Sequence, residues 1–265
     1  MDSYGILGRK IGHSISPTLQ NQAYKAHDIA AQFLTFEVEP EDLAKKIVEF
    51  KNSDIKGLIV TIPYKEQVAQ YLDRLDRTAQ KSGVVNVIEK IGNEYVGYNF
   101  DGIAWLSGIY KEFNLQTLAS MSVLLIGFGG VAQSIYTELL QFKNIQITIV
   151  NRTIEKLKNS IDNPMIKIKS FDEFTGDLSN YDLVIQTTPV GMWPQIDQTP
   201  MEITKVKTNA IYSDVIYNPF QTAFLKQAEQ LGAKTQNGMP MLVEQNEKVI
   251  EMWFGKQVKL TFNER

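Results

Sequence analysis

The feature that most constrains this chain is the stretch at residues 123–153, which combines apolar runs with glycines at defined spacing. Residues 123–127 (VLLIG) are short, apolar and rich in branched side chains, which is typical of a buried parallel strand. Residues 133–142 carry apolar side chains at helical spacing, and residues 145–150 form a second apolar run. The pattern predicts a strand, a turn, a helix and a second strand, which together form a βαβ unit.

The turn between the first strand and the helix has the pattern G-x-G-x-x-A. Gly127 permits a tight turn, Gly129 lets a phosphate approach the backbone, and Ala132 lets the helix pack closely on the strand. The positive end of the helix would direct free N–H groups at a pyrophosphate. The position of the pattern between two strands favours a dinucleotide site over an ordinary turn. The predicted cofactor-binding residues here are Gly127, Phe128, Gly129, Gly130, Val131 and Ala132.

The end of the second strand indicates which dinucleotide is bound. The tip is Asn151-Arg152-Thr153, and Lys156 follows one helical turn later. Between the end of this strand and Glu155 there is no acidic residue. An NAD enzyme usually has a carboxylate here for the ribose hydroxyl, whereas a cation suits the 2′-phosphate of NADP. Arg152 can hold that phosphate with two hydrogen bonds. The alternatives are a solvated charge at Arg152 and a helix N-cap at Thr153, but the spacing favours NADP.

The composition excludes several classes of function. The chain of 265 residues has a formal net charge of −3, so charge gives no reason to expect a nucleic-acid or membrane partner. It has no cysteine, and its two histidines are His13 and His27, so we expect no disulfide and no metal site. No secretion signal and no apolar run of roughly 20 residues is present, so we expect a cytoplasmic protein.

Strands alternate with helices even before the dinucleotide unit, which predicts an α/β layer there. The other expected strands are residues 4–7, 33–38, 57–62, 182–186 and 210–214, with a hairpin of residues 87–89 and 94–98 across Gly92-Asn93. The other expected helices are residues 17–27 with Ser16 as the N-cap, a helix opened by Pro40 with Leu43, Ile47 and Val48 on one side, and residues 65–72, 102–113, 221–231 and 241–254.

The predicted fold class is α/β with two domains. Residues 1–101 form an amino-terminal α/β domain, and residues 102–238 form a Rossmann-type dinucleotide-binding domain. Residues 239–265 complete the first domain, because the last helix is expected to return to it.

Four groups of polar residues lie outside the dinucleotide unit. Ser14 and Ser16 precede a helix, where they could hold a carboxylate or act only as caps. Lys65 follows a strand and Asp101 lies in a glycine-bounded turn, and each has an ordinary alternative as a solvated charge or a turn residue. Asn86 and Gln245 are uninformative by themselves.

The joint order of these residues resembles the shikimate dehydrogenase family, whose members interconvert 3-dehydroshikimate and shikimate with NADP. The resemblance covers nearly the whole chain. Its motifs are G-H-S-x-S-P at 12–17, V-T-I-P-x-K at 60–65, S-G-x-V-N at 82–86, G-Y-N-x-D-G at 97–102, G-x-G-G-x-A at 127–132, N-R-T at 151–153, T-T-P-x-G-M at 187–192, D-x-x-Y-N-P at 214–219 and N-G-x-x-M-L-x-x-Q at 237–245.

The resemblance implies a role for each matching residue. The first domain would then be the substrate-binding and catalytic domain, with Lys65 and Asp101 as the catalytic pair. The implied substrate residues are Ser14 and Ser16 for the carboxylate, Thr61, Asn86, Asp101 and Gln245 for ring hydroxyls, and Tyr217 nearby. The implied NADP residues are 127–132, Asn151, Arg152, Thr153 and Lys156, with Val215 and Gly238 beside the nicotinamide. The implied partners are shikimate and 3-dehydroshikimate, in a monomer or a homodimer.

The residue types suit this chemistry. Hydride leaves C3 of shikimate while the hydroxyl proton goes to a base, and the reverse reaction needs an acid at the same place. Without a metal or a suitable histidine, a positioned lysine is the best remaining candidate. Whether Lys65 carries the proton itself or polarises the oxygen is left open by the sequence.

Three positions depart from the family pattern. Ile59 replaces a usual Asn, Phe100 replaces a usual Thr in N-T-D-G, and Val87 replaces a usual Thr after Asn86. The loss of hydrogen-bonding groups in a pocket can change the substrate. Two alternatives therefore stay open: a paralogue acting on quinate or another ring hydroxy acid, and a non-catalytic NADP(H)-binding module.

Overall fold

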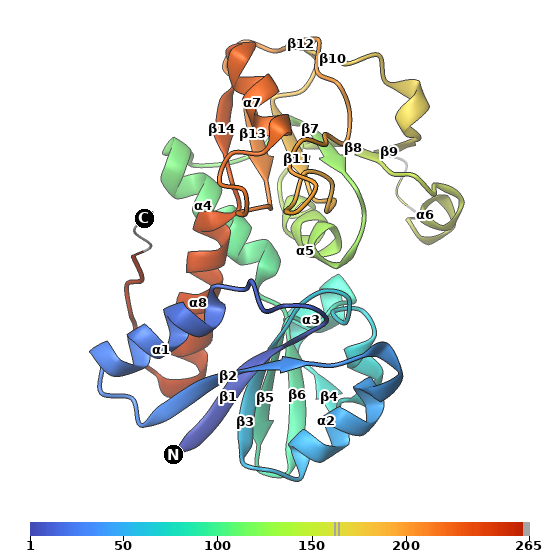
Figure 1. The fold of residues 1–265 in the computed structure, drawn as a ribbon. Coiled ribbons are helices and arrows are strands. Elements are labelled where there is room, and N and C mark those ends of the chain that lie inside the picture. The colour runs from blue at the N-terminus through green and yellow to red at the C-terminus, as the bar shows by residue number, and fades with distance from the viewer. Residues whose placement is uncertain (162, 164, 262–265) are drawn as a thin grey trace. The chain divides into compact units, whose positions relative to one another are not determined.

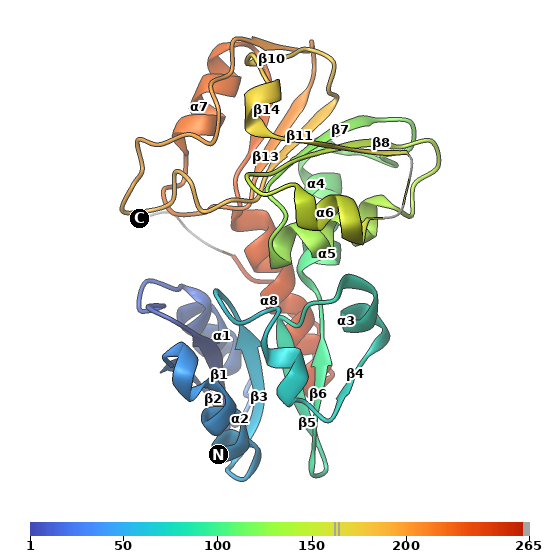
Figure 2. The same cartoon turned by 90° about the vertical axis from the view of Figure 1, so that its right-hand side faces the viewer.

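The chain divides into two compact units in a computed structural model that describes residues 1–161, 163 and 165–261, without the side chains of residues 156, 159 and 160. Unit 1 contains Met1–Ala104 and the chain from Leu242 onward, and unit 2 contains Trp105–Met241. Each unit is built on a sheet with helices against it (Figures 1 and 2). Within the described ranges, no helix is both long enough and apolar enough to cross a membrane.

Unit 1 contains a six-stranded mixed sheet in the order β2-β1-β3-β5-β6-β4. The strands are β1 (Asp2–Gly8), β2 (Ala31–Glu37), β3 (Ile55–Val60), β4 (Arg74–Leu75), β5 (Val87–Ile91) and β6 (Glu94–Tyr98). Strands β1, β2 and β3 are parallel, whereas β5 is antiparallel to both β3 and β6. The predicted hairpin across Gly92-Asn93 is confirmed as β5 and β6. Because β5 is reversed, its first residue lies at the edge of the sheet where β3 and β6 end.

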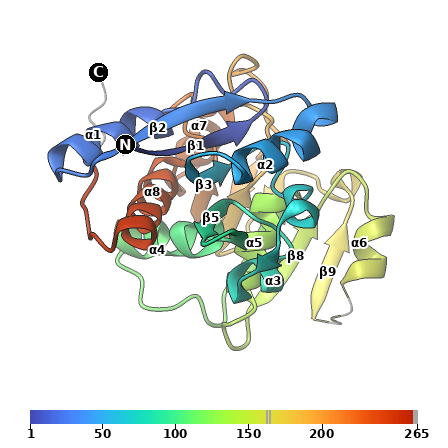
Figure 3. The ribbon, with the colours of Figure 1, turned by 90° about the horizontal axis from the view of Figure 1, so that it is seen from below.

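Helices pack on both faces of this sheet. They are α1 (Ser16–Ala26), the 3-10 turn η1 (Pro40–Asp42), α2 (Leu43–Lys51), the 3-10 turn η2 (Val68–Tyr71), α3 (Arg77–Ser82), the start of α4 (Asp101–Phe113) and most of α8 (Met239–Phe254). One buried cluster joins α1 and α8 to the sheet through residues such as Tyr24, Val249 and Ile59. A second cluster joins α2, η2 and α3 to the opposite face. Figures 1 and 3 show α1 beside α8.

Some local expectations for unit 1 are wrong. Ser16 is the first residue of α1 rather than its N-cap, because the cap position is taken by Ile15, which makes no side-chain cap bond. Leu43 and Ile47 are buried on α2, but Val48 is 58% exposed and lies off that apolar face. The helix expected at residues 65–72 is reduced to the short 3-10 turn η2, and residues 65–67 before it form a turn.

Unit 2 contains a six-stranded parallel sheet in the order β14-β13-β11-β7-β8-β9. Its strands are β7 (Ser122–Ile126), β8 (Gln146–Val150), β9 (Ile166–Lys169), β11 (Leu183–Gln186), β13 (Ile211–Asp214) and β14 (Lys234–Gln236), and a separate parallel pair is formed by β10 (Asp177–Leu178) and β12 (Lys205–Val206). The predicted βαβ unit is confirmed as β7, α5 (Gly130–Leu139) and β8, which pairs with β7 in parallel.

The helices of unit 2 cover both faces of its sheet. Besides α5 and the larger part of α4, they are α6 (Glu155–Ser160), the 3-10 turn η3 (Phe171–Glu173) and α7 (Ala223–Gln230). One cluster packs α4 and α5 on β7 and β8, and the other packs α7 on β11 and β13. Thr153 is not the N-cap of α6, because the helix begins two residues later and Ile154 occupies the cap position.

Candidate active site and dinucleotide site

Lys65 is positioned by backbone hydrogen bonds on both sides of its loop. After β3 ends, the Thr61 N–H donates to Leu7 O at 2.9 Å, and the Tyr64 N–H donates to Thr61 O at 2.9 Å. The Val85 N–H then donates to the Lys65 carbonyl at 2.8 Å. The loop that carries Lys65 is therefore fastened to the strand before it and to the segment that leads into β5.

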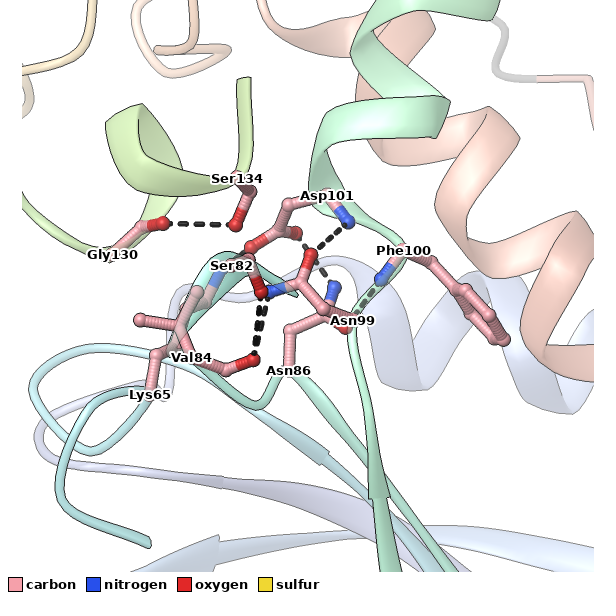
Figure 4. Close-up of polar contacts among 9 residues, drawn as sticks. All are labelled: Lys65, Ser82, Val84, Asn86, Asn99, Phe100, Asp101, Gly130 and Ser134. Carbon is pink, nitrogen blue, oxygen red and sulfur yellow. Dashed lines mark hydrogen bonds and ion pairs between the residues drawn. The ribbon is translucent and has the colours of Figure 1, made fainter. Parts of the chain in front are cut away.

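The Lys65 ammonium forms an ion pair with Asp101, the first residue of α4. Lys65 Nζ lies 2.5 Å from Asp101 Oδ2, although the two residues are 36 positions apart in the chain. The other carboxylate oxygen, Oδ1, accepts from Asn86 Nδ2 at 2.7 Å. The side chain of Asp101 is 2% exposed and that of Lys65 is 14% exposed. The carboxylate is therefore enclosed, whereas the ammonium keeps some access to solvent. Figure 4 shows the polar contacts of this group.

Asn86 connects the pieces that carry the ion pair. Its backbone N–H donates to Tyr98 O at 3.0 Å, and its carbonyl accepts from the Val60 N–H at 2.7 Å. Its side-chain Oδ1 accepts from the Phe100 N–H at 2.8 Å. Because Asn86 also donates to Asp101, one fully buried residue ties the ends of β3 and β6 to the start of α4.

Asn99 has no role in the sequence-based prediction, yet its hydrogen bonds hold the segment that leads into Asp101. Its Oδ1 accepts from the Asp101 N–H at 3.1 Å, and its Nδ2 donates to Val84 O at 3.1 Å. Its own N–H donates to Thr78 Oγ1 at 2.8 Å. The available signal was its place inside the motif at residues 97–102, next to Asp101.

An ammonium paired with an enclosed carboxylate suits proton transfer. The carboxylate keeps the lysine tip at one place and provides negative charge beside it, and desolvation makes this attraction stronger than it is in water. A lysine ammonium has three N–H donors, so two remain for an oxygen of a bound molecule after one is given to Asp101. The arrangement can donate a proton to a carbonyl oxygen or receive one from a hydroxyl.

The predicted carboxylate-binding serines lie where the chain enters α1. Ser14 is half-buried and its Oγ accepts from the Ser16 N–H at 3.4 Å, whereas Ser16 is 2% exposed. The end of β1, which leads into this segment, passes close to Thr61, because a Cβ on Gly8 would lie 2.6 Å from Thr61 Cγ2. Gln245 lies buried on α8, the helix that packs beside α1.

The three departures from the family pattern lie together in the core between the sheet and α8. Ile59 is 2% exposed and is the direct cross-strand neighbour of Val87, which is fully buried. Phe100 packs in the same cluster, with its ring centroid 6.1 Å from that of Tyr98. Figure 4 shows the Phe100 ring turned away from the Asp101 carboxylate.

The predicted phosphate-binding turn lies in unit 2 between β7 and α5. Gly127 has a φ of +91°, and a Cβ there would lie 2.8 Å from Thr188 Cγ2, so this position requires glycine. Gly129 is the N-cap of α5, has no side chain to satisfy the first-turn N–H groups, and would meet nothing within 4 Å with a Cβ. The helix start is fixed from within by the Ser134 hydroxyl, which donates to Gly130 O at 2.9 Å (Figure 4).

These residues fit an NADP molecule. The exposed space over Gly129 and the uncapped N–H groups of α5 suit a pyrophosphate, and no acidic side chain stands in the first turn to repel it. Arg152 and Thr153 are exposed just after β8, and Asn151 Nδ2 donates to Thr153 O at 3.0 Å, which shapes that tip. The side chain of Lys156 lies outside the part of the chain that the structure describes.

Two further predicted cofactor residues, Val215 and Gly238, are in contact within unit 2. A Cβ on Gly238 would lie 2.1 Å from Val215 O, and the Gly238 N–H donates to Ile216 O at 2.9 Å. Tyr217 follows in the same loop and is half-buried. Unit 2 therefore carries Tyr217, while the other predicted substrate residues belong to unit 1.

The sequence reasoning also missed Asp214, which holds this loop. Its carboxylate accepts from the Ile216 N–H at 2.9 Å and from the Thr222 hydroxyl at 2.8 Å. Thr222 in turn caps α7 by accepting from the Leu225 N–H. Burial raises the pKa of Asp214 to about 7, although both hydrogen bonds act to lower it.

Comparison with known protein families gives matches in both units. Residues 6–88 match the model of the shikimate dehydrogenase substrate binding domain, and residues 110–212 match the model of shikimate / quinate 5-dehydrogenase.

Individual proteins match over almost the full chain. A shikimate dehydrogenase (NADP(+)) of Bacillus cytotoxicus is 39% identical over 256 residues, covering 95% of this chain and 92% of that protein. A crystal structure of a shikimate dehydrogenase in complex with NADP+ has a TM-score of 0.87 at 32% identity, covering 98% of this chain and 92% of the other. Shikimate dehydrogenase 1 from Peptoclostridium difficile has a TM-score of 0.88 at 29% identity, with coverages of 98% and 94%. The chain therefore belongs to the shikimate dehydrogenase family.

Proposed function

We propose that this protein is an NADP-dependent shikimate dehydrogenase, which reversibly reduces 3-dehydroshikimate to shikimate. The observation that carries the proposal is the ion pair of Lys65 and Asp101, enclosed and fastened by Asn86. The proposal is supported by relatives named as NADP(+)-dependent shikimate dehydrogenases and by a similar structure solved with NADP+. It is also supported by the glycine cradle at the start of α5.

The two units have separate roles in this proposal. Unit 1 binds the ring acid and carries the proton-transfer pair, and unit 2 binds NADP. The Ser14 and Ser16 hydroxyls hold the substrate carboxylate, and Thr61, Asn86 and Gln245 hold ring hydroxyls. Tyr217 is a further proposed substrate residue and belongs to unit 2, as do Val215 and Gly238, which would border the nicotinamide. Residues 127–132 would hold the pyrophosphate of NADP, and Asn151, Arg152, Thr153 and Lys156 would hold its 2′-phosphate.

When bound, NADP would accept the hydride from C3 of shikimate. The side chains of the protein accept or donate the proton of the C3 oxygen. In the oxidative direction, the C3 hydroxyl donates its proton to the Lys65–Asp101 pair as the carbonyl forms. In the reductive direction, Lys65 Nζ donates a proton to the carbonyl oxygen. Asp101 keeps the lysine tip in place in both directions, because its second oxygen is anchored by Asn86.

The positions of the three departures, two buried and one partly buried, favour shikimate over a different ring acid. Ile59 and Val87 are enclosed in the core, and the Phe100 ring points away from the acid–base pair. These side chains therefore remove no hydrogen-bonding group from the surface beside Lys65. Quinate, which the matching family model also names, is the competing substrate in the assay below.

The test is to mix purified protein with NADP and shikimate, then with NADP and quinate, and to follow the absorbance of reduced cofactor. We expect faster turnover with shikimate, and Lys65→Ala should lower kcat by about 10²–10⁴-fold. Lys46→Ala is the matched control, because Lys46 also forms an ion pair but on the exposed surface of α2.

The outcomes separate the candidates. Faster turnover with quinate than with shikimate would identify quinate as the preferred substrate and contradict the proposal. Binding of NADP without turnover of either acid would contradict the enzyme and support a binding module.

A further inference from the structure

A pair of buried amide side chains joins α1 to α8 inside the apolar core of unit 1. Gln20 Nε2 donates to Asn246 Oδ1 at 2.9 Å and lies 3.4 Å from the Asn246 carbonyl. Both side chains are fully buried, and the two residues are 226 positions apart in the chain. Asn246 Nδ2 completes the group by donating to Leu242 O at 2.8 Å, one turn earlier on α8.

This pair of amides stabilises the core less than apolar side chains at the same two positions would. Its neighbours along the two helices, Ala23, Tyr24, Val249 and Ile250, belong to an apolar cluster. Gln20 Oε1 has no hydrogen-bond partner among the residues that the structure describes. A partly satisfied buried polar group is less favourable than well-packed apolar side chains of similar volume. Two leucines would fill the place without this cost, so the amides call for another explanation.

The position of the pair gives that explanation. Ser16 precedes Gln20 by four residues on α1, so the two lie on one face of the helix, one turn apart. Gln245 precedes Asn246 directly on α8. The amide pair therefore lies next to both of the segments that carry predicted substrate contacts, and it joins them by a directional bond.

We propose that Gln20 and Asn246 are positioning residues, which set the register of α1 against α8 and thereby the spacing between Ser16 and Gln245. This inference rests on the proposed function, in which Ser16 binds the substrate carboxylate and Gln245 binds a ring hydroxyl. Apolar side chains pack well at several neighbouring registers, whereas an amide-to-amide hydrogen bond is satisfied at only one. The pair thus gives the ring acid two contacts at a fixed separation.

The experiment compares Gln20→Leu, Asn246→Leu and the double variant by thermal unfolding and by steady-state kinetics. Each single variant leaves one buried amide without its partner, so it should lower Tm. The double variant should recover most of the Tm, because both polar groups are replaced together. We expect KM for shikimate to stay raised by about 10-fold in the double variant, with KM for NADP unchanged and kcat changed much less.

The matched control is Gln32→Leu. Gln32 Nε2 donates to Ser3 Oγ at 2.9 Å, the same length of bond, but between the second residues of β1 and β2, away from Ser14 and Ser16. This variant should leave KM for shikimate unchanged.

Two results would overturn the inference in different ways. A double variant that recovers both Tm and the original KM would show that the pair only fills the core. A wild-type protein that turns over no shikimate would contradict the proposed function, and the positioning role would fall with it.

Discussion

Ile59 on β3 lies directly opposite Val87 on β5, and both side chains are enclosed in the core that α8 covers. The family pattern has Asn and Thr at these two places, so the chain has exchanged a polar cross-strand pair for an apolar one. Exchanging both partners of a buried polar contact can be nearly neutral, whereas exchanging one leaves the other unsatisfied. The two departures are therefore best understood as one compensated change.

Restoring the family residue at one of these positions should damage the protein. We expect Ile59→Asn to lower the free energy of unfolding by about 2–4 kcal/mol, because it buries an amide opposite a valine and leaves a cavity. Urea unfolding measures this, with Ile59→Val as the control at about 0.5–1.5 kcal/mol. Unchanged stability with faster turnover of shikimate would instead mean that residue 59 faces the substrate.

Gly129 offers a test of the cofactor site that leaves the fold intact. A Cβ there meets no protein atom within 4 Å, so Gly129→Ala should change stability by less than about 1 kcal/mol. The methyl group would occupy the space proposed for the pyrophosphate, so the Kd for NADP should rise at least about 10-fold. Titration calorimetry measures the Kd, and unaltered binding would place the cofactor elsewhere.

In contrast to Gly129, Gly238 should not tolerate a larger side chain without loss of stability. A Cβ at this residue would lie 2.1 Å from the Val215 carbonyl oxygen, which is backbone and cannot move aside cheaply. We expect Gly238→Ala to cost about 2–3 kcal/mol of stability in thermal unfolding, because the two segments must separate. A stable variant with full NADP binding would show that this loop can relax.

Arg152 should determine the preference between the two dinucleotides. Arg152→Ala removes the proposed contacts to the 2′-phosphate, so we expect KM for NADP to rise by about 10–100-fold. KM for NAD, which lacks that phosphate, should change little. Arg74→Ala removes an exposed arginine that pairs with Glu94 in unit 1, and it should leave both constants unchanged. Equal effects of Arg152→Ala on both cofactors would contradict a phosphate-specific role.

Asp214 should make the stability of unit 2 depend on pH. Its pKa of about 7 in the folded protein lies above the ordinary value of 3.8, so the folded state binds the extra proton between these values. The free energy of unfolding should therefore fall as pH rises from about 4 to about 7, by a few kcal/mol at most, and then stay level.

The variant Asp214→Asn isolates this contribution. Its Tm relative to that of the wild type should be higher at pH 8 than at pH 5, because asparagine cannot ionise. The same Tm difference at both pH values would mean that Asp214 is already ionised in the folded protein at pH 5.

The parts of the fold that were predictable are those with a strong local pattern. The unit of β7, α5 and β8 follows from two apolar runs and three small residues, and the hairpin of β5 and β6 follows from Gly92-Asn93. Helix α3 was missed, although Asp76 caps its start and Gly83, with a φ of +72°, ends it. Its six residues are too few to show a helical period.

The site was predictable only in part, because its geometry depends on distant segments. Nothing in the residues alone joins Lys65 to Asp101, and the family resemblance supplied that pairing. The N-caps expected at Ser16 and Thr153 failed because a cap depends on where the first helical turn closes, which neighbouring residues shift by one or two places. No spacing rule reveals the buried contacts of Asp214 and Gln20, and only the position of Asn99 inside the motif at residues 97–102 pointed to that residue.

The reversed direction of β5 has a practical consequence for engineering. Asn86 and Tyr98 stand at one end of the hairpin, so the turn at Gly92 lies at the other end, and a Cβ on Gly92 would meet nothing within 4 Å. Chain segments whose backbone is exposed accept insertions and new termini best. A reporter tag, or the break point of a circularly permuted or split protein, can therefore be placed at this tip without disturbing the residues that hold Lys65 and Asp101.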